Sequence, residues 1–274
     1  MLRARLATAA VAIPLLLAII FFAPAWGWRA VVGILSLLAL SEYLGLAFHR
    51  RTGPRLIGSA LGLTVVAAAI SAPAPGPWVA GALSTLLAGA LSYVVLTRRD
   101  LERALADVGL IAIGVLYAAL LLPHFYWLRL LPDGAEWVTF VIAVSMAGDS
   151  GGYFVGHSFG RHKLIPHISP GKTVEGAIGI VVFSLVAGAA GKLIFFPHYG
   201  WGEILLLAFA MAVLGQIGDL SESAMKRAFG AKESGGLFPG HGGMLDRIDS
   251  LLFPGVLVYY YLLATGTPAA AQAC

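Results

Sequence analysis

Acidic, basic and hydroxyl side chains gather in four short blocks in the second half of the 274-residue chain. The first block, "AGDSGGYFVGHSFG" (147–160), places Asp149 inside an apolar stretch and follows it with a serine and two glycines. A carboxylate at membrane depth is costly unless it is paired, hydrated or bound to metal. The alternative is a polar contact between helices that the glycines allow to pack closely. A second polar block close behind it in the sequence favours a functional site.

The second block, "ISPGKTVEG" (168–176), is typical of an anion site at the start of a helix. Ser169-Pro170-Gly171 is predicted to form a turn, and Lys172 and Thr173 then precede an apolar helix. Backbone N–H groups and the helix dipole favour an anion at that position, and the lysine adds a positive charge. The spacing of a Walker A loop is absent. Helix capping plus a lysine on the cytoplasmic side is the alternative, and this block alone does not decide between them.

The third block, "GQIGDLSESAMKRAFGAKES" (215–234), predicts a helix with a charged face. Asp219, Glu222 and Lys226 fall at i, i+3 and i+7, and Ser223 lies four residues after Asp219. Two carboxylates one turn apart suit an oxygen-ligated cation such as Mg²⁺. The alternative is an exposed ion pair between Glu222 and Lys226, worth a few tenths of a kcal/mol. That alternative leaves Asp219 unexplained.

The fourth block, "GLFPGHGGMLDRIDS" (236–250), is an unusually polar entry into the last apolar span. Asp246 and Asp249 are spaced i, i+3, with Arg247 between them and His241 among glycines just before. One acid in a first helical turn could simply interact with the helix dipole. Two acids, a histidine and an arginine together are more than helix capping requires. The glycines let the backbone approach a ligand closely. The block therefore predicts a metal–phosphate site, in which Mg²⁺ bridges carboxylates to substrate phosphates.

The rest of the chain is far more apolar than a soluble protein. Charged residues make up 12% of it and hydrophobic residues 59%, and mean hydropathy is +0.86. Soluble domains carry about a quarter charged residues. Continuous apolar runs of about 20 residues suit membrane-crossing helices, whereas barrel strands alternate over about 10 residues. An all-α, polytopic integral membrane protein is predicted; its one cysteine, Cys274, allows no intrachain disulfide.

About nine transmembrane helices are predicted, near 5–23, 28–47, 56–73, 77–97, 105–127, 137–156, 174–196, 203–222 and 250–265. Alternate connections carry 15 and 3 of the 18 Lys and Arg residues. By the positive-inside rule, this split places the N-terminus in the cytoplasm and the C-terminus outside. Residues 23–25 resemble a signal-peptide cleavage site, but the long apolar run before them and the charge alternation favour a retained first span.

The polar blocks divide the chain into two regions. Before residue 140 the acids are scattered singly, so residues 1–135 are predicted to form a scaffold of transmembrane helices. Residues 136–274 are predicted to form the catalytic region. Its two long loops, 157–173 and 223–249, lie on the cytoplasmic side.

The fourth block and the residues before it resemble a family signature. The run "SAMKRAFGAKESGGLFPGHGGMLDRIDS" (223–250) is similar to that of the CDP-diacylglycerol synthases, also called phosphatidate cytidylyltransferases. "SPGKTVEG" (169–176) and "GDSGGYFVGHSFGRHKL" (148–164) resemble that family's upstream blocks. The chain departs from the pattern at Glu233, where the family usually has Asp, and at Val174, where Trp is common. Glu233 is therefore left out of the predicted ligand set.

The resemblance implies transfer of a cytidylyl group from CTP to phosphatidate, giving CDP-diacylglycerol and pyrophosphate without a protein nucleophile. It implies two Mg²⁺ ions, leaves a monovalent cation open, and implies a homodimer with no nucleic-acid partner. The implied location is the bacterial cytoplasmic (inner) membrane, with the active site facing the cytoplasm. Catalytic roles fall to Asp219, Asp246, Lys226 and Asp149; metal binding to Asp219, Asp246 and Asp249; substrate binding to Lys172, Ser169, Thr173, Ser223, Arg227, His241 and Arg247.

Three other functions compete with this interpretation. Acids within the membrane also mark ion pathways of transporters, but transporters often show internal repeats, and the two halves of this chain are unlike. Another CTP-dependent lipid enzyme, such as a polyprenol or phytol kinase-like protein or an archaeal-type CDP-lipid synthase, would change the lipid or the chemistry. A CDP-alcohol phosphatidyltransferase would need a dense Asp-Gly…Asp…Asp pattern that the sequence lacks.

Overall fold

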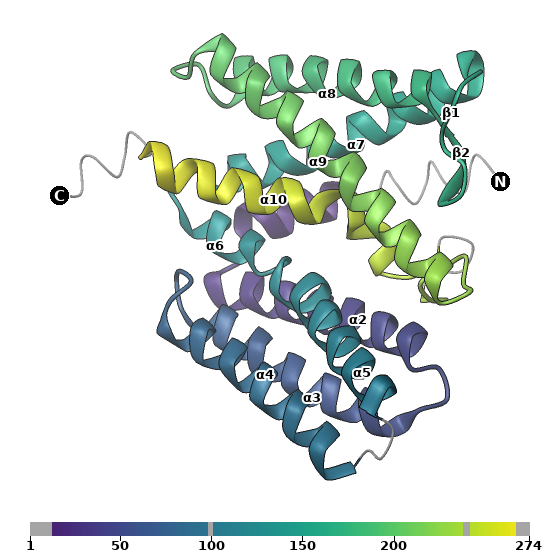
Figure 1. The fold of residues 1–274 in the computed structure, drawn as a ribbon. Helices are drawn as coiled ribbons and strands as arrows, with labels where there is room; N and C mark the ends of the chain where they lie inside the picture. The colour runs from purple at the N-terminus through teal and green to yellow at the C-terminus, as the bar shows by residue number, and fades with distance from the viewer. Residues whose placement is uncertain (1–12, 98–100, 238–241, 267–274) are drawn as a thin grey trace.

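The computed structural model describes residues 13–97, 101–237 and 242–266 (Figure 1). Within these ranges eight helical segments are long and apolar enough to cross a membrane, which confirms the all-α, polytopic membrane fold. A shorter apolar helix, Ile13–Phe22, falls within the first expected span, of which residues 5–12 lie outside the described part of the chain. The eight spans are α2 (Ala25–Ala47), α3 (Thr52–Ser71), α4 (Pro77–Thr97), Arg103–Leu130, α7 (Gly134–Phe159), α8 (Val174–Ile194), α9 (Trp201–Ala228) and α10 (Leu245–Thr265).

The span Arg103–Leu130 is built from three pieces. Helix α5 (Leu101–Gly114) runs into a π-helix, η1 (Val115–Leu120), and α6 (His124–Leu130) follows after Pro123. Short π-helical segments often occur at functional sites. Here the widened turn carries Tyr117, whose buried hydroxyl donates to the carbonyl of Gly218 at 3.3 Å. The N-terminal half thus contacts the backbone of α9 next to Asp219.

The connections between spans lie at two opposite ends of the molecule (Figure 1). The α2–α3 and α9–α10 connections and the strands β1 (Lys163–Ile165) and β2 (Ser169–Thr173) lie at one end, at the right of the view. The α3–α4 and α8–α9 connections and the C-terminal end of α10 lie at the other end. This arrangement agrees with the alternation of basic residues between connections.

The two predicted loops are shorter than expected because the flanking helices continue into them. Helix α7 extends to Phe159, and residues 163–173 then form the antiparallel hairpin β1–β2. Helix α9 extends to Ala228 and α10 begins at Leu245. Asp246 and Asp249 therefore lie in the first two turns of α10, so helical geometry holds them.

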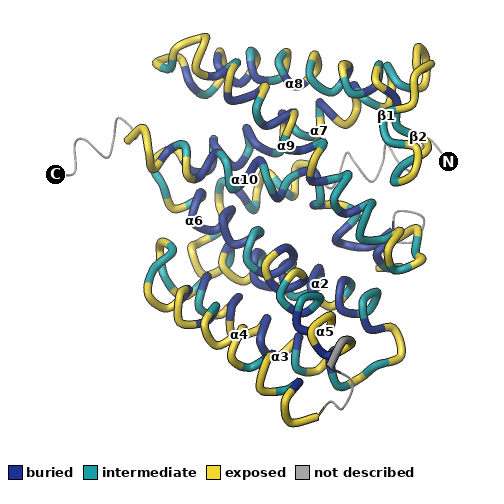
Figure 2. The backbone as a smooth tube through the Cα atoms, in the orientation of Figure 1, coloured by how far each residue is buried: buried dark blue, intermediate teal, exposed yellow. Residues whose placement is uncertain are grey.

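Helices α7 and α8 pack closely because glycines line their contact. A Cβ at Gly179 would lie 2.8 Å from the Gly151 carbonyl oxygen and 2.7 Å from the Val155 Cβ. Much of α8 outside this contact is exposed (Figure 2). The exposed positions include the apolar residues Val186 and Leu193, as expected for a surface that contacts lipid.

Gly179→Ala is expected to destabilise the protein, because backbone and side-chain atoms of α7 already fill the space that the new methyl group needs. Overpacking of this kind costs about 1–3 kcal/mol, and thermal unfolding in detergent should show the loss as a lower Tm. Gly109→Ala is the matched control, since a Cβ there meets nothing within 4 Å and alanine favours a helix by up to ~1 kcal/mol. An equal Tm for the two variants would contradict this account of the α7–α8 contact.

Candidate functional site

The hairpin β1–β2 leads directly into α8. The prediction of a turn at Ser169-Pro170-Gly171 is wrong. These residues form the start of β2, and the turn lies at 166–168. Pairing with β1 explains the difference, because Ser169 faces Ile165 across the hairpin. Thr173 caps α8, its Oγ1 accepting from the Gly176 N–H at 3.1 Å. The capping alternative therefore accounts for one contact of Thr173.

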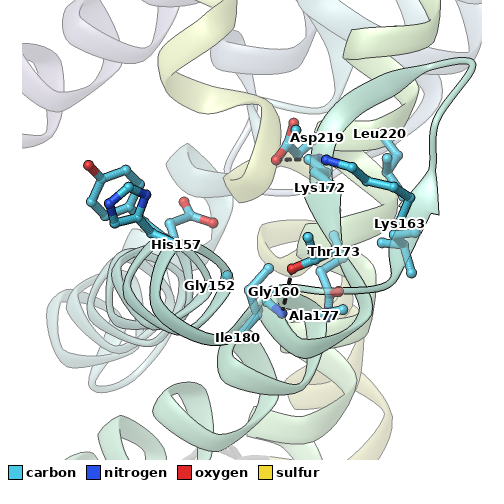
Figure 3. Close-up of a pocket in the computed structure, with 17 residues that line it drawn as sticks. Gly152, His157, Gly160, Lys163, Lys172, Thr173, Ala177, Ile180, Asp219 and Leu220 are labelled. Atoms are coloured by element: carbon cyan, nitrogen blue, oxygen red, sulfur yellow. Dashed lines mark hydrogen bonds and ion pairs between the residues drawn. The ribbon is translucent and has the colours of Figure 1, made fainter.

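A cavity of about 480 Å³, which we call the polar cavity, opens beside this hairpin (Figure 3). Lys172 and Asp219 face each other at its wall, with Nζ 2.6 Å from Oδ2. Both side chains keep about a quarter to a third of their surface exposed. A cation and a carboxylate thus lie where a bound phosphate or metal ion could contact either. The charged and polar residues that line the cavity are Asp149, Tyr153, His157, Lys163, Lys172, Thr173, Gln216 and Asp219.

A second cavity of about 470 Å³, which we call the apolar cavity, lies on another side of Asp149. Its lining is mostly hydrophobic and comes from both halves of the chain: Leu16, Trp28, Val31, Val32, Leu35, Leu122, Phe125, Ile142, Met146, Ile248 and Leu251. Polar residues at the start of α10 complete it, namely Asp246, Arg247, Asp249 and Ser250, together with Asp149 and Ser150 of α7. Asp149 is the one charged residue that lines both cavities within the described part of the chain.

Ser250 connects the acids of α7 and α10. Its backbone N–H donates to Asp249 Oδ1 at 2.7 Å, and its hydroxyl donates to Asp149 Oδ2 at 2.9 Å. Helix α9 approaches the same place through Gly218, where a Cβ would lie 2.4 Å from the Asp249 carbonyl oxygen. Because Asp219 follows Gly218, the crossing of α9 and α10 brings acids from three helices to the wall between the cavities.

A second group of charges lies between α9 and α10, nearer the end of α9 than Asp219. Lys226 Nζ is 2.5 Å from Asp246 Oδ1 and also forms an ion pair with Glu222. The Glu222 side chain is 1% exposed, and its Oε1 has no hydrogen-bond partner. The structure therefore contradicts the exposed-pair alternative, because this pair is buried and shared with a third residue. We call Glu222, Lys226 and Asp246 the charge cluster.

The second carboxylate oxygen of Asp246 accepts hydrogen bonds from the protein. Asp246 Oδ2 accepts from the Ser234 N–H at 2.9 Å, the Ser234 hydroxyl at 2.8 Å and the Gly243 N–H at 2.8 Å. With Lys226 on Oδ1, both oxygens of the carboxylate have protein partners. The assignment of Asp246 to a metal ion stays a prediction.

The other predicted substrate residues occupy different surroundings. Ser223 Oγ lies 3.5 Å from Asp219 Oδ1, beside the polar cavity. Arg227 is directed away from it, to the carbonyl oxygens of Ala231 at 2.8 Å and Ile168 at 3.3 Å, so it ties the end of α9 to the hairpin. Ser169 is in β2 and is not among the described residues that line the polar cavity. His241 lies outside the described residues.

A divalent cation fits the oxygen donors of this site only in part. Among the described residues, no group of three or more His, Cys, Asp or Glu could hold a metal ion. Mg²⁺, however, commonly takes one or two carboxylates and completes its shell with water and substrate phosphates. Asp149 and Asp219 both line the polar cavity, so the donors suit an ion that arrives with a nucleotide's phosphates.

Glu42 belongs to α2, in the region predicted to be scaffold, and was not among the predicted site residues. Its carboxylate accepts from the N–H groups of Met244 and Leu245 at 2.8 and 2.9 Å, at the start of α10. The missed signal was an acid near the end of an otherwise apolar span, where an unpartnered charge is costly. The contact spans about 200 residues of sequence, and nothing local in the chain indicates it.

The fold and site together define a class: a polytopic helical membrane protein with acids and lysines at one end, between a polar and an apolar cavity. Comparison with known proteins gives the family. A model of the cytidylyltransferase family matches residues 3–265, and the chain therefore belongs to that family.

The similar curated proteins carry a more specific name. A phosphatidate cytidylyltransferase of Bacillus subtilis (strain 168) is 39% identical over 173 residues, which cover 63% of this chain and 64% of the relative. One from Staphylococcus haemolyticus is 36% identical over 226 residues, covering 80% of this chain and 84% of the relative. One from Staphylococcus aureus (strain COL) is 35% identical over 226 residues, which also cover 80% of this chain and 84% of the relative.

Proposed function

We propose that this protein transfers the cytidylyl group of CTP to phosphatidate, giving CDP-diacylglycerol and pyrophosphate. The observation that carries the proposal is the pair of cavities that meet at Asp149. The polar cavity, with Lys163 and Lys172, suits a nucleotide's phosphates, and the apolar cavity suits the acyl chains of a lipid. The names of the relatives support these two substrates.

The reaction needs no protein nucleophile. An oxygen of the phosphatidate phosphate forms a bond to the α-phosphorus of CTP, and the bond from that phosphorus to the oxygen bridging to the β-phosphorus breaks. Pyrophosphate leaves with the electron pair. The protein's contribution is positioning and charge neutralisation, with Lys172 beside the phosphates of CTP and Arg247 beside the lipid phosphate.

Mg²⁺ is part of the proposal. Bound with the nucleotide, it would neutralise developing charge on the phosphate oxygens. Asp219 and Asp149 would hold it from the polar cavity, with Asp249 next to them through Ser250. The proposal places the site on the cytoplasmic side of the bacterial inner membrane, and the basic residues of the connections at this end support the cytoplasmic side. A monovalent cation and a homodimer stay predictions.

The assignment of the apolar cavity to the lipid predicts a selective effect of filling it. Ile142→Trp adds a large side chain to its wall, so we expect the KM for phosphatidate to rise about tenfold, equivalent to about 1.4 kcal/mol. The KM for CTP should stay within about twofold. Steady-state kinetics in mixed micelles measures both constants.

The matched control is Ile178→Trp, because Ile178 is 58% exposed on α8 and lines neither cavity. It should leave both KM values near those of the wild-type protein. A rise in the KM for CTP alone in Ile142→Trp would assign the apolar cavity to the nucleotide instead.

Product analysis tests the function itself. The purified protein should consume CTP and release pyrophosphate only when phosphatidate and Mg²⁺ are both present. Release of CDP with phosphorylation of a lipid alcohol would instead identify a kinase, the nearest competing enzyme. No turnover of CTP with any lipid would overturn the proposal.

A further inference from the structure

Helix α2 contacts the start of α10 through Glu42, which lies five residues before the helix ends. We infer that Glu42 is a positioning residue for the proposed reaction: it fixes the first turn of α10, and with it Arg247 and Asp249, against the cavities. The inference rests on the proposed function for the reaction that Glu42 serves. The positioning itself is argued from the hydrogen bonds of Glu42.

The carboxylate of Glu42 binds the start of α10 through both oxygens. Oε1 accepts from the Met244 N–H at 2.8 Å, and Oε2 accepts from the Leu245 N–H at 2.9 Å. The first N–H groups of a helix have no partner within the helix, and a negative charge there is favourable to the helix dipole. Met244 itself has no side-chain hydrogen bond that would cap α10, so a residue about 200 positions earlier supplies this cap.

Ser234 links Glu42 to the charge cluster. Its buried hydroxyl lies 3.1 Å from Glu42 Oε2 and 2.8 Å from Asp246 Oδ2. A hydroxyl has a single proton to donate, so these two carboxylates share it. The Ser234 hydroxyl oxygen also accepts a hydrogen bond from the Asp246 N–H, at 3.3 Å. Glu42, Ser234 and Asp246 therefore tie the end of the α9–α10 connection at Ser234 to the first turn of α10.

Two glycines make room for this contact. A Cβ at Gly243 would lie 2.3 Å from Glu42 Oε2, and a Cβ at Gly235 would lie 2.8 Å from Glu42 Oε1. Real Cβ atoms do not approach another atom that closely, so any larger residue at either position would displace the carboxylate. Both glycines belong to the polar run that precedes α10. Part of the glycine content of that run is therefore explained by the contact with Glu42, and not by the approach of a ligand.

The position of Glu42 gives the contact a consequence for catalysis. Residues of α2 line the apolar cavity, and residues 246–251 of α10 line it from the other side. The wall between the two cavities is set by where the first turns of α10 lie. Misplacing reacting groups by about 1 Å can cost about 10²-fold in rate, so a loosened cap should act mainly on the chemical step.

The variant Glu42→Gln keeps the size of the side chain but turns one acceptor into an N–H₂ donor facing a backbone N–H. We expect kcat to fall by about 10- to 100-fold. The KM for CTP should stay within about twofold, because the polar cavity is lined by α7, α8, α9 and the hairpin. Glu136→Gln, at the start of α7, makes the same chemical change in a different helix and should leave kcat within about twofold.

A second readout does not depend on activity. Lys232 is exposed and lies two residues before Ser234, whose hydroxyl bonds Glu42, so trypsin should cleave after it faster in Glu42→Gln than in the wild-type protein or in Glu136→Gln. Ser234→Ala removes the shared hydroxyl alone and should produce both effects in weaker form. Since the cleavage rate is measured without CTP or lipid, it stays informative even if the proposed function fails.

Two results would overturn the inference. One is an unchanged cleavage rate together with a kcat within twofold of wild type in Glu42→Gln. The other is faster cleavage with a kcat that is unchanged, which would show a cap without a catalytic consequence. A kcat loss accompanied by faster cleavage, an unchanged KM for CTP and an intact gel-filtration profile supports it.

Discussion

Replacing Asp219 with asparagine is expected to lower kcat by about 10³-fold, on the scale seen when one stabilising group is removed from a transition state. The side chain keeps its size but loses its negative charge. Asp219 lies 2.6 Å from Lys172 at the wall of the polar cavity, where the phosphates of CTP and their Mg²⁺ would bind. Asparagine is a weaker ligand for Mg²⁺ and leaves Lys172 without its charge partner. A pyrophosphate-release assay with saturating CTP and phosphatidate measures the loss.

The Mg²⁺ dependence separates metal binding from a purely structural role. If Asp219 holds the ion, the Mg²⁺ concentration at half-maximal rate should rise in the variant. Asp133→Asn is the matched control, because Asp133 precedes α7 in a left-handed conformation (φ 52°) that asparagine also adopts readily. It should behave as wild type. Full activity of Asp219→Asn at unchanged Mg²⁺ dependence would rule out the metal assignment.

Asp246→Asn should behave differently from Asp219→Asn if its contacts are structural. All of its carboxylate oxygens have protein partners, including Lys226 and the Ser234 and Gly243 N–H groups. A structural role therefore predicts a lower Tm and an unchanged Mg²⁺ dependence. A shift of the Mg²⁺ dependence without a change in Tm would instead establish Asp246 as a metal ligand, as the family resemblance implies.

The membrane spans could be predicted from sequence because their signal is local. An apolar run of about 20 residues has few alternatives to a transmembrane helix, and α4 (Pro77–Thr97) matches its predicted bounds at both ends. Helix ends near the site were less predictable. Polar residues such as Lys226 and Asp246 lower the hydropathy that marks a span, yet they continue the helices because their charges pair with one another.

The site could be predicted as a set of residues but not as a set of contacts. Asp149, Lys172 and Asp219 were expected together and do line one cavity. The pairing of Lys172 with Asp219 crosses from β2 to α9, and periodicity along one helix cannot show it. Glu42 was missed because it, too, pairs across elements. Two of its partners are the backbone N–H groups of Met244 and Leu245, which leave no trace in residue type.

Lys226→Met is expected to cost the protein about 3–5 kcal/mol of stability, because it breaks a buried ion pair by removing one partner. Lys226 is the cation of the charge cluster, and its side chain is 12% exposed while those of Glu222 and Asp246 are 1% and 10% exposed. Without it, two carboxylates face each other across the α9–α10 contact. At about 2–4 °C for each kcal/mol in a protein of this size, Tm in detergent should fall by about 10 °C.

A second substitution tests the cause of that loss. Glu222→Gln in the Lys226→Met background removes one of the two uncompensated charges, so part of the lost Tm should return. Lys163→Met is the control for losing a lysine, since Lys163 is exposed and donates to the Pro170 carbonyl oxygen at 2.8 Å; its Tm should stay near that of wild type. No recovery in the double variant would show that the cluster does not act through charge balance.

The same double variant decides the catalytic role predicted for Lys226. If Lys226 only balances the charges of Glu222 and Asp246, pyrophosphate release should recover together with Tm. If Lys226 also contacts a phosphate, Tm should recover while kcat stays low, because no other group of the charge cluster carries a positive charge. The geometry favours the first result: with the Lys226 ammonium 2.5 Å from Asp246 Oδ1 and paired with Glu222, a phosphate would have to displace a buried carboxylate to reach it.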